Sequence, residues 1–300
     1  MELKHLTVND FDAVVELLDG VFSRKYGRET RFAKLFPRIF TAPRADMMNA
    51  HIGAFEGGRL IGTAAMYPID YVVGGQHIRL IANGNVAVHE DFRGRGVMSV
   101  MLDRINEECD SCGDLCYLHG DPVRYGRWGY IGGGIEYKLT FEPTGGGYDF
   151  LPLNQGEVPF CLALAEARSD YVVRREDELI PALRSGGREA VAVYTADTPG
   201  KTSRMVGCLS LNREGAFVEE FAIQGGIEPQ VFAALAAKLG RPLTVRLSGY
   251  DAGTLARCRD FAKVEEAQPT LFRVIHPERL REAALAAGVD ADVMYAPYLT

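Results

Sequence analysis

The chain has 300 residues, of which 47% are hydrophobic and 24% charged, and its net charge is −7. This length is typical of two domains, and the composition is that of an ordinary globular protein. The negative net charge excludes a broad basic surface that could bind nucleic acid. No apolar run reaches the roughly 18 residues of a membrane span, and residues 1–18 lack a signal-peptide core, so we expect a cytoplasmic protein without a membrane or nucleic-acid partner.

The first half of the chain is predicted to begin with a strand at residues 2–7 and two helices, one starting at Asn9 or Asp10 and one spanning 29–40. Glycine pairs at 57–58 and 74–75 separate apolar runs and predict hairpin turns in an antiparallel meander. The strand-like runs are 51–55, 60–69, 71–73 and 78–88. After them we expect a helix from Val97, a strand at 115–118, a helical turn at 123–128 and a strand at 135–141.

Residues 142–157, EPTGGGYDFLPLNQGE, collect proline and glycine without periodicity and mark the expected domain boundary. We therefore expect a first domain at 1–143, a linker at 144–157 and a second domain at 158–300. A helical stretch at 158–184 opens the second half, and its later elements repeat the order of the first. They are strands at 190–194, 205–211, 216–223, 243–247 and 270–275, with helices at 229–239 and 254–262.

The stretch HEDFRGRGVM, residues 89–98, lies between a predicted strand and a predicted helix. Such a junction presents unpaired backbone N–H groups and the positive end of a helix dipole. Gly94 and Gly96 allow close approach of a phosphate, and Arg93 and Arg95 add positive charge. The loop is therefore a candidate anion-binding site.

Three other interpretations of this loop are disfavoured. The chain has no G-x-x-x-x-G-K-[ST] sequence, which excludes a P-loop. A dinucleotide-binding fingerprint is only partly met, because Ser99 stands at its third glycine position. An RNA contact of the RGG type belongs in a disordered tract, whereas this loop lies between two ordered elements.

The loop resembles motif A of the GNAT N-acetyltransferases, [RQ]-x-x-G-x-[GA], preceded by the strand Val86-Ala87-Val88. In that family the loop amides bind the pyrophosphate of acetyl-CoA and the strand binds the pantetheine arm. The resemblance implies tandem GNAT-like domains of the α/β (α+β) class, each a mixed, largely antiparallel sheet flanked by helices. It places the acetyl-CoA site on Val86, Ala87, Val88, Arg93, Gly94, Arg95, Gly96, Val97, Met98, Ser99, Gly120 and Asp121.

Met98 stands where the motif usually has glycine or alanine, a departure that is familiar in the enhanced-intracellular-survival type of acetyltransferase, which also has tandem GNAT-like domains. The segment 124–130, RYGRWGY, resembles the I-Y-G-R-F-G-Y segment of the same enzymes. Its first tyrosine acts there as general acid toward the departing thiolate. The resemblance therefore implies that Tyr125 is the general acid.

The general base stays open. In the enhanced-intracellular-survival enzymes the C-terminal carboxylate acts as the general base, and a sterol-carrier-like domain places it in the active site. A chain of 300 residues is expected to lack most or all of that domain, although the carboxylate of Thr300 remains a candidate. His119, Asp121, Glu136 and a water relay are equally open.

The second half lacks the anion-binding loop. Its equivalent segment at 224–229, QGGIEP, has no arginine and places Glu228 at a helix start, where the carboxylate would stabilise the dipole and repel a phosphate. We therefore expect the second domain not to bind CoA. It is expected instead to line the substrate cleft or to support the first domain.

Six cysteines are spread along the chain, and Cys109, Cys112 and Cys116 are spaced closely enough to hold a soft metal. His119 is the only nearby fourth ligand, so reduced structural thiols are favoured and no metal is expected.

The resemblance to the GNAT enzymes implies an acetyl-CoA-dependent N-acetyltransferase that acts on a primary amine of a small molecule or peptide. A non-catalytic acyl-CoA-binding or sensor protein is the alternative, and a nucleotide-dependent Rossmann enzyme is a weaker one.

Overall fold

Residues 1–196, 202–290 and 293–294 are described by the computed structural model of the chain. The chain divides into two units, each built from segments that are not consecutive in the sequence. The first unit comprises 1–70, 79–132 and 270–277, and the second comprises 71–78, 133–269 and 278–300. These units differ from the expected contiguous division at 143 and 158. Residues 71–73 pair with 170–172, residues 136–141 pair with 243–248, and residues 271–274 pair with 115–118.

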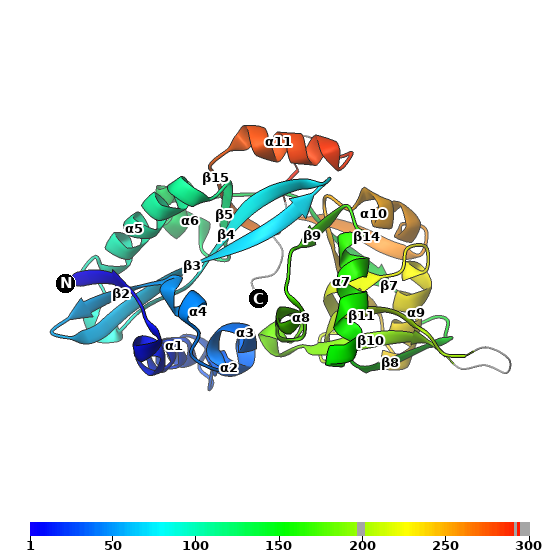
Figure 1. The fold of residues 1–300 in the computed structure, drawn as a ribbon, viewed down its shortest axis with the longest axis horizontal. Helices are drawn as coiled ribbons and strands as arrows, with labels where there is room; N and C mark the ends of the chain where they lie inside the picture. Colours follow the sequence, from blue (N-terminus) through cyan, green and yellow to red (C-terminus); the bar gives the residue numbers. More distant parts are fainter. Residues whose placement is uncertain (197–201, 291–292, 295–300) are drawn as a thin grey trace. The chain divides into compact units, whose positions relative to one another are not determined.

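A mixed sheet forms the centre of the first unit, in the order β1-β2-β3-β4-β5-β15-β6 (Figure 1). The strand β9 belongs to the second unit, and it pairs with residues 71–73 of β3, which belong to that unit as well. The pair β4–β5 is parallel, whereas β1–β2, β2–β3, β5–β15 and β3–β9 are antiparallel. The strands are β1 (Glu2–His5), β2 (His51–Glu56), β3 (Arg59–Val73), β4 (Gln76–Val88), β5 (Leu115–Leu118), β6 (Ile131–Gly133), β9 (Asp170–Val172) and β15 (Thr270–Val274).

One long amphipathic helix, α5, packs against this sheet through Val97, Met101 and Ile105, which meet Ile52 and Ile81 in a common apolar core. The helical segments of this part of the chain are η1 (Val8–Asp10), α1 (Phe11–Tyr26), α2 (Phe32–Leu35), α3 (Pro37–Phe40), α4 (Ala45–Asn49), η2 (Glu90–Phe92), α5 (Val97–Cys112), α6 (Pro122–Tyr125) and η3 (Gly126–Trp128).

The helix expected at 29–40 is replaced by the two short helices α2 and α3. Pro37 occupies the first position of α3, and Phe36 before it has a non-helical backbone. Proline lacks an N–H and disfavours helical geometry in the preceding residue, so the helix breaks there. The expected strands at 60–69 and 71–73 are one strand, β3, and the hairpin turn at Gly74-Gly75 is present, with φ of 55° and 79°.

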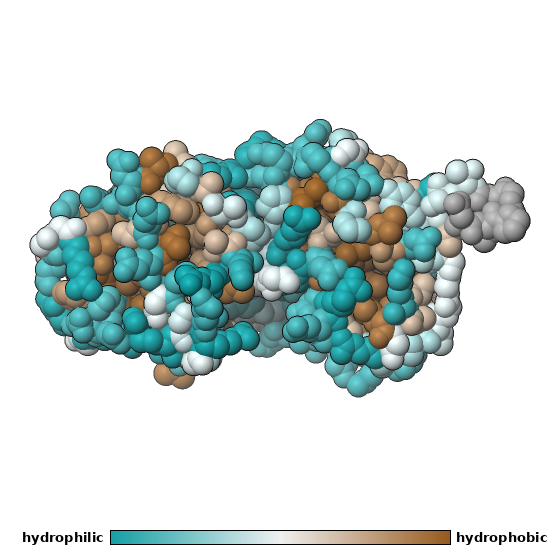
Figure 2. Space-filling view, turned by 90° about the horizontal axis from the view of Figure 1, so that it is seen from below, coloured by the Kyte–Doolittle hydropathy of each residue, from teal (hydrophilic) through white to brown (hydrophobic). Residues whose placement is uncertain are grey.

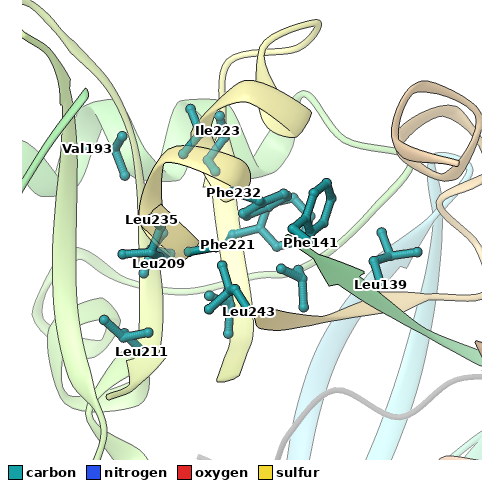
Figure 3. Close-up of a cluster of buried hydrophobic side chains, with 14 of the residues drawn as sticks. Leu139, Phe141, Val193, Leu209, Leu211, Phe221, Ile223, Phe232, Leu235 and Leu243 are labelled. Carbon is teal, nitrogen blue, oxygen red and sulfur yellow. The ribbon is translucent and has the colours of Figure 1, made fainter. Parts of the chain in front are cut away.

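The second sheet has the order β14-β7-β13-β12-β11-β10-β8, with β12–β13 parallel and the other five neighbouring pairs antiparallel. Figure 3 shows its core, in which Phe141, Phe221 and Phe232 meet. The strands are β7 (Glu136–Phe141), β8 (Tyr148–Pro152), β10 (Glu189–Thr195), β11 (Met205–Asn212), β12 (Phe217–Ile223), β13 (Leu243–Ser248) and β14 (Ala262–Ala267). The helices are η4 (Gln155–Glu157), α7 (Val158–Glu166), α8 (Glu176–Leu183), η5 (Ser185–Gly187), α9 (Glu228–Leu239), α10 (Ala252–Cys258) and α11 (Pro277–Ala286).

Both sheets are mixed, largely antiparallel and flanked by helices, which confirms the predicted fold class. Two strands lie in sheets that chain order did not predict: β7 pairs with β13 and β14, and β15 pairs with β5. The expected linker at 144–157 contains β8 and η4, and the helix expected at 158–184 is interrupted by β9. β8 pairs with β10, and β9 pairs with β3. This pairing explains both differences, because it satisfies the backbone N–H and C=O groups of segments whose sequences show no strand periodicity.

Hydrophilic side chains predominate on the face shown in Figure 2, and apolar ones gather there in separate patches. Within the described residues, no helix combines the length and apolar character that crossing a membrane requires.

Candidate functional site

The loop that joins β4 to α5 has the geometry of an anion-binding turn. Gly96 caps the N-terminus of α5 with φ 78°, and Gly94 has φ 75°. No side chain caps this helix, and no acidic residue lies in its first turn. The helix therefore supplies no partner for its own first N–H groups, which favour an anion. The loop follows β4 of a mixed sheet, rather than the first strand of a parallel sheet as in dinucleotide-binding folds.

A pocket of about 660 Å³ opens at this loop, within the size range of small-ligand sites. Four cationic side chains line it, Arg24, Lys25, Arg93 and Arg124, which gives this pocket a positive character in a chain of net charge −7. Apolar side chains of β4, α5 and α1 complete the lining. The pocket therefore suits a ligand with a polyanionic end and an apolar arm.

Nine of the twelve residues predicted to bind acetyl-CoA line this pocket: Val86, Ala87, Val88, Arg93, Gly94, Gly96, Val97, Met98 and Ser99. Arg95 is not among the lining residues. Its guanidinium donates to Glu56 at 2.6 Å and 3.2 Å, and it stacks on the Phe92 ring at 5.0 Å. The two arginines of the loop thus have different environments, and Arg93 is the one that lines the pocket.

Gly120 and Asp121 also lie outside the pocket lining. The Asp121 side chain caps α6 by accepting from the N–H groups of Val123 and Arg124. A Cβ on Gly120 would lie 2.3 Å from the Tyr125 ring, so only glycine fits against that ring. In this structure both residues shape the turn that carries Tyr125.

Tyr125 ends α6 and is 8% exposed. Its ring lies 6.3 Å from the Tyr130 ring at a near-perpendicular angle, and 6.4 Å from the Trp128 ring. Burial raises the pKa of its hydroxyl, and Arg124 lowers it less strongly. Arg124, the preceding residue, lines the pocket, whereas Tyr125 does not. A tyrosine with a raised pKa keeps its proton at neutral pH, as a general acid must.

Tyr130 anchors this aromatic turn to the sheet and to α5. Its hydroxyl donates to Asn83 Oδ1 of β4 at 2.9 Å and lies 3.2 Å from Asn106 Oδ1 of α5. Trp128 is held separately by a bond from its indole N–H to Asp103 at 2.7 Å. These contacts fix the two rings that pack against Tyr125.

Sequence reasoning missed Asn85, the residue directly before the pocket-lining strand segment. It has a positive φ of 54° inside β4 and is buried. Its Nδ2 donates to the Tyr67 hydroxyl at 2.6 Å, Tyr67 lies 2.9 Å from His51 Nε2, and His51 Nδ1 lies 3.0 Å from the Met47 carbonyl. A buried hydrogen-bonded chain therefore supports the backbone where the pocket begins.

His51 is neutral in this chain of hydrogen bonds, because burial lowers its pKa to about 4. The Met47 carbonyl can only accept, which assigns the ring proton to Nδ1 and leaves Nε2 to accept from Tyr67. The Tyr67 oxygen then accepts from Asn85. Each of these three hydrogen bonds thus joins one donor to one acceptor.

Sequence reasoning also missed the face of α1 that lines the pocket, including Val21 and Phe22 beside Arg24 and Lys25. Arg24 forms an ion pair with Glu90 at 3.3 Å. The two cations lie in the last turn of α1, where basic residues commonly stabilise a helix dipole. Their position in the sequence therefore did not distinguish stabilisation of the dipole from lining of a ligand pocket.

None of the predicted base candidates that the structure describes lines the pocket. His119 Nδ1 lies 3.2 Å from the Thr270 hydroxyl, and Asp121 serves as a helix cap. Glu136 belongs to the second unit, where it pairs with Arg246 at 2.6 Å. Thr300 lies outside the described residues.

The equivalent loop of the second unit is filled by its own carboxylate. Glu228 is 2% exposed, accepts from the Gly226 N–H at 2.7 Å and pairs with Arg257 at 2.5 Å. All six cysteines are free thiols, and the described residues contain no group of three side chains placed to hold a metal ion.

Comparison with known proteins agrees with this geometry. Residues 2–131 match the model of the acetyltransferase (GNAT) domain family. None of the curated proteins matches the sequence significantly. Solved structures with a similar fold include a conserved protein from Enterococcus faecalis, with TM-score 0.65, 14% identity and coverage of 94% of this chain and 74% of the other.

Two further structures share the fold over 94% of this chain. A GCN5-related N-acetyltransferase from Kribbella flavida has TM-score 0.61 and 17% identity, with 73% of its own chain covered. Eis1 from Mycobacterium abscessus has TM-score 0.57 and 14% identity, with 76% covered. The predicted fold resemblance is thereby confirmed. The segment 2–131, somewhat less than half of the chain, thus matches a GNAT acetyltransferase domain.

Proposed function

We propose that the protein is an acetyl-CoA-dependent N-acetyltransferase that acetylates a primary amine of a small molecule or peptide. The observation that carries this proposal is the pocket at the β4–α5 loop, where helix N–H groups meet four cationic side chains. A CoA molecule carries phosphate groups at one end and a long pantetheine arm at the other. Arg93 and the glycine loop suit the phosphates, and residues 86–88 suit the arm.

In the proposed reaction the amine nitrogen bonds to the acetyl carbon, and the carbon–sulfur bond breaks. A backbone N–H near Val86 or Val88 polarises the thioester carbonyl. The departing thiolate takes a proton from Tyr125, whose raised pKa keeps that proton available. We propose that the amine proton passes to solvent through a water relay, and that a proton from solvent restores the Tyr125 hydroxyl.

The pair Arg93 and Arg95 tests the binding part of the proposal. Arg93→Ala is expected to weaken CoA binding and its salt dependence, because it removes a charge from the pocket lining. Arg95→Ala is the matched control, since this arginine pairs with Glu56 instead. Titration calorimetry with CoA at two salt concentrations measures both. Equal affinities for the two variants would contradict the assigned site.

Tyr125→Phe tests the catalytic part. Loss of a positioned acid typically lowers the rate by about 100- to 10,000-fold. We expect kcat to fall in this range, with CoA affinity unchanged, when thiol release is followed with acetyl-CoA and a panel of primary amines. An unchanged rate would remove Tyr125 from the mechanism.

A non-catalytic acyl-CoA-binding protein is the second candidate, favoured by the absence of Tyr125 and of the described base candidates from the pocket lining. The same assay separates the two functions. Tight CoA binding without turnover on any amine would support the binding protein. We further propose a cytoplasmic location without a nucleic-acid partner, supported by six free thiols and the acidic net charge.

A further inference from the structure

A second, smaller cavity lies wholly within the second unit, between β9, β12, β13 and the end of α7. Its volume of about 60 Å³ is enough for a small head group or for a few water molecules. Charged and aromatic side chains line it, among them Asp170, Arg168, Arg246, Tyr71 and Phe221. The proposed acetyl transfer makes no use of this cavity.

Each arginine at this cavity has a carboxylate partner. Arg246 donates to Glu136 at 2.6 Å and to Glu219 at 2.7 Å. Arg168 pairs with Asp251 at 2.8 Å, and its guanidinium lies 4.3 Å from the centre of the Phe221 ring. These partners neutralise the guanidinium charge. The cavity is therefore poorly suited to an anion.

Glu220, a carboxylate of the lining, is similarly satisfied, because Arg174 donates to it at 2.5 Å and 3.1 Å. Asp170 is different. It is 5% exposed, and its Oδ2 accepts from the Tyr71 hydroxyl. Its Oδ1 has no partner of hydrogen-bond geometry among the described residues, even though the Ser248 hydroxyl of the same lining lowers the pKa of this carboxyl. A buried carboxylate oxygen without a donor is unfavourable, so the cavity offers an unfilled acceptor.

We propose that this cavity binds the head group of a small organic cation, a primary ammonium or a guanidinium, through Asp170. Such a group supplies both the missing N–H donor and the charge that a buried carboxylate needs. The lining also includes the aromatic residues Tyr71 and Tyr171, a residue type that favours cations. A hard divalent metal requires about six oxygen ligands, whereas guanidinium groups share this lining. The proposal stands independently of CoA binding, because it concerns residues of the second unit alone.

Binding is tested on the full chain by titration calorimetry with ethylammonium and methylguanidinium, and with tetramethylammonium as a cation that lacks an N–H. We expect saturable binding of the first two and weaker binding of the third. Asp170→Asn is expected to weaken binding at least tenfold. Asp260→Asn, the same change at an exposed position of the same unit, is expected to leave it unchanged.

Ala165→Leu provides a second variant if Asp170→Asn does not fold. Ala165 lines the cavity from α7, so the larger side chain is expected to fill it and abolish binding without altering any charge. The absence of saturable binding to the wild-type chain would show that the cavity holds water only and would overturn the proposal. Equal binding to wild type and to a folded Asp170→Asn or Ala165→Leu variant would overturn it too. CoA affinity, measured in parallel, separates this result from a failure of the acetyltransferase proposal.

Discussion

Asn85 Nδ2 donates a hydrogen bond of 2.6 Å to the Tyr67 hydroxyl at the position where β4 adopts a positive φ. The next residue, Val86, lines the proposed CoA pocket. Positive φ costs a residue with a Cβ energy that the surrounding structure must offset, and asparagine tolerates it better than most. The side-chain bond thus holds an unfavourable backbone conformation beside the site.

Asn85→Gly and Asn85→Ala separate the backbone from the side chain. Both lose the bond to Tyr67, but only glycine adopts the observed φ of 54° freely. We expect the alanine variant to be less stable than the glycine variant by about 1 kcal/mol, and both to be less stable than wild type. Urea unfolding measures this order. An alanine variant as stable as the glycine variant would show that the positive φ is not maintained in solution.

His51 should make stability fall in mild acid. Its folded-state pKa is lowered to about 4 by burial, whereas the unfolded value is near 6.5. Below pH 6.5 the unfolded chain binds a proton that the folded chain does not, so stability is lost as pH falls from 6.5 toward 4. Relative to His51→Gln, we expect wild type to lose about 2 kcal/mol between about pH 8 and pH 5.

The measurement is urea unfolding of both proteins across that pH range. Contributions of the other titrating groups are common to both and cancel in the difference. A difference that does not change with pH would mean that His51 titrates normally and is not buried as the structure shows.

Much of the first unit was predictable because its patterns are local. Apolar runs in residues 51–88, glycine pairs at the turns and a change of period at Val97 specify a meander followed by a helix. The strand–loop–helix geometry around residues 93–96 was predictable for the same reason, since it needs only a strand, a glycine loop and a helix start. The structure places those three elements together.

Features that depend on distant partners were not predictable. Leu139 and Phe141 alternate as in any half-buried strand, and nothing in that pattern says that β7 lies between β13 and β14. Asp170 belongs to a three-residue strand within an expected helix, and its burial depends on Tyr71, 99 residues earlier. Asn85 follows Asn83-Gly84, a pair that is typical of turns, yet it lies inside β4. Its conformation depends on Tyr67 of the neighbouring strand, which the local sequence does not reveal.

Gly120 is expected to be essential to the position of Tyr125. In Gly120→Ala the new Cβ would lie 2.3 Å from the Tyr125 ring and displace it. We expect kcat to fall at least tenfold with little change in CoA affinity, since a small misplacement of a catalytic group is costly. Gly126→Ala is the matched control, because an added Cβ there meets nothing within 4 Å. Steady-state kinetics on both variants provides the comparison, and similar rates would contradict the packing role.

Asp170 should give the opposite pH dependence to His51. Burial is the largest influence and raises its pKa above the ordinary 3.8, while Arg168 and the Tyr71 and Ser248 hydroxyls lower it and Asp251 raises it further. Because the folded chain holds this proton more tightly, the contribution to stability is complete below pH 3.8 and is lost as pH rises through the folded-state pKa. Wild type should therefore lose stability relative to Asp170→Asn over that range.

Urea unfolding of both proteins from acidic to neutral pH measures this difference in stability. The same unfolding experiment is then repeated in saturating ethylammonium. A bound cation stabilises the ionised carboxylate, so the loss of stability with rising pH should shrink when the cation is present. If the stability of wild type relative to Asp170→Asn instead rises with pH in the absence of ligand, Asp170 is ionised and already paired within the protein. In that case Arg168, its strongest favourable charge, is the group that neutralises it, and the cavity has no need of a cation.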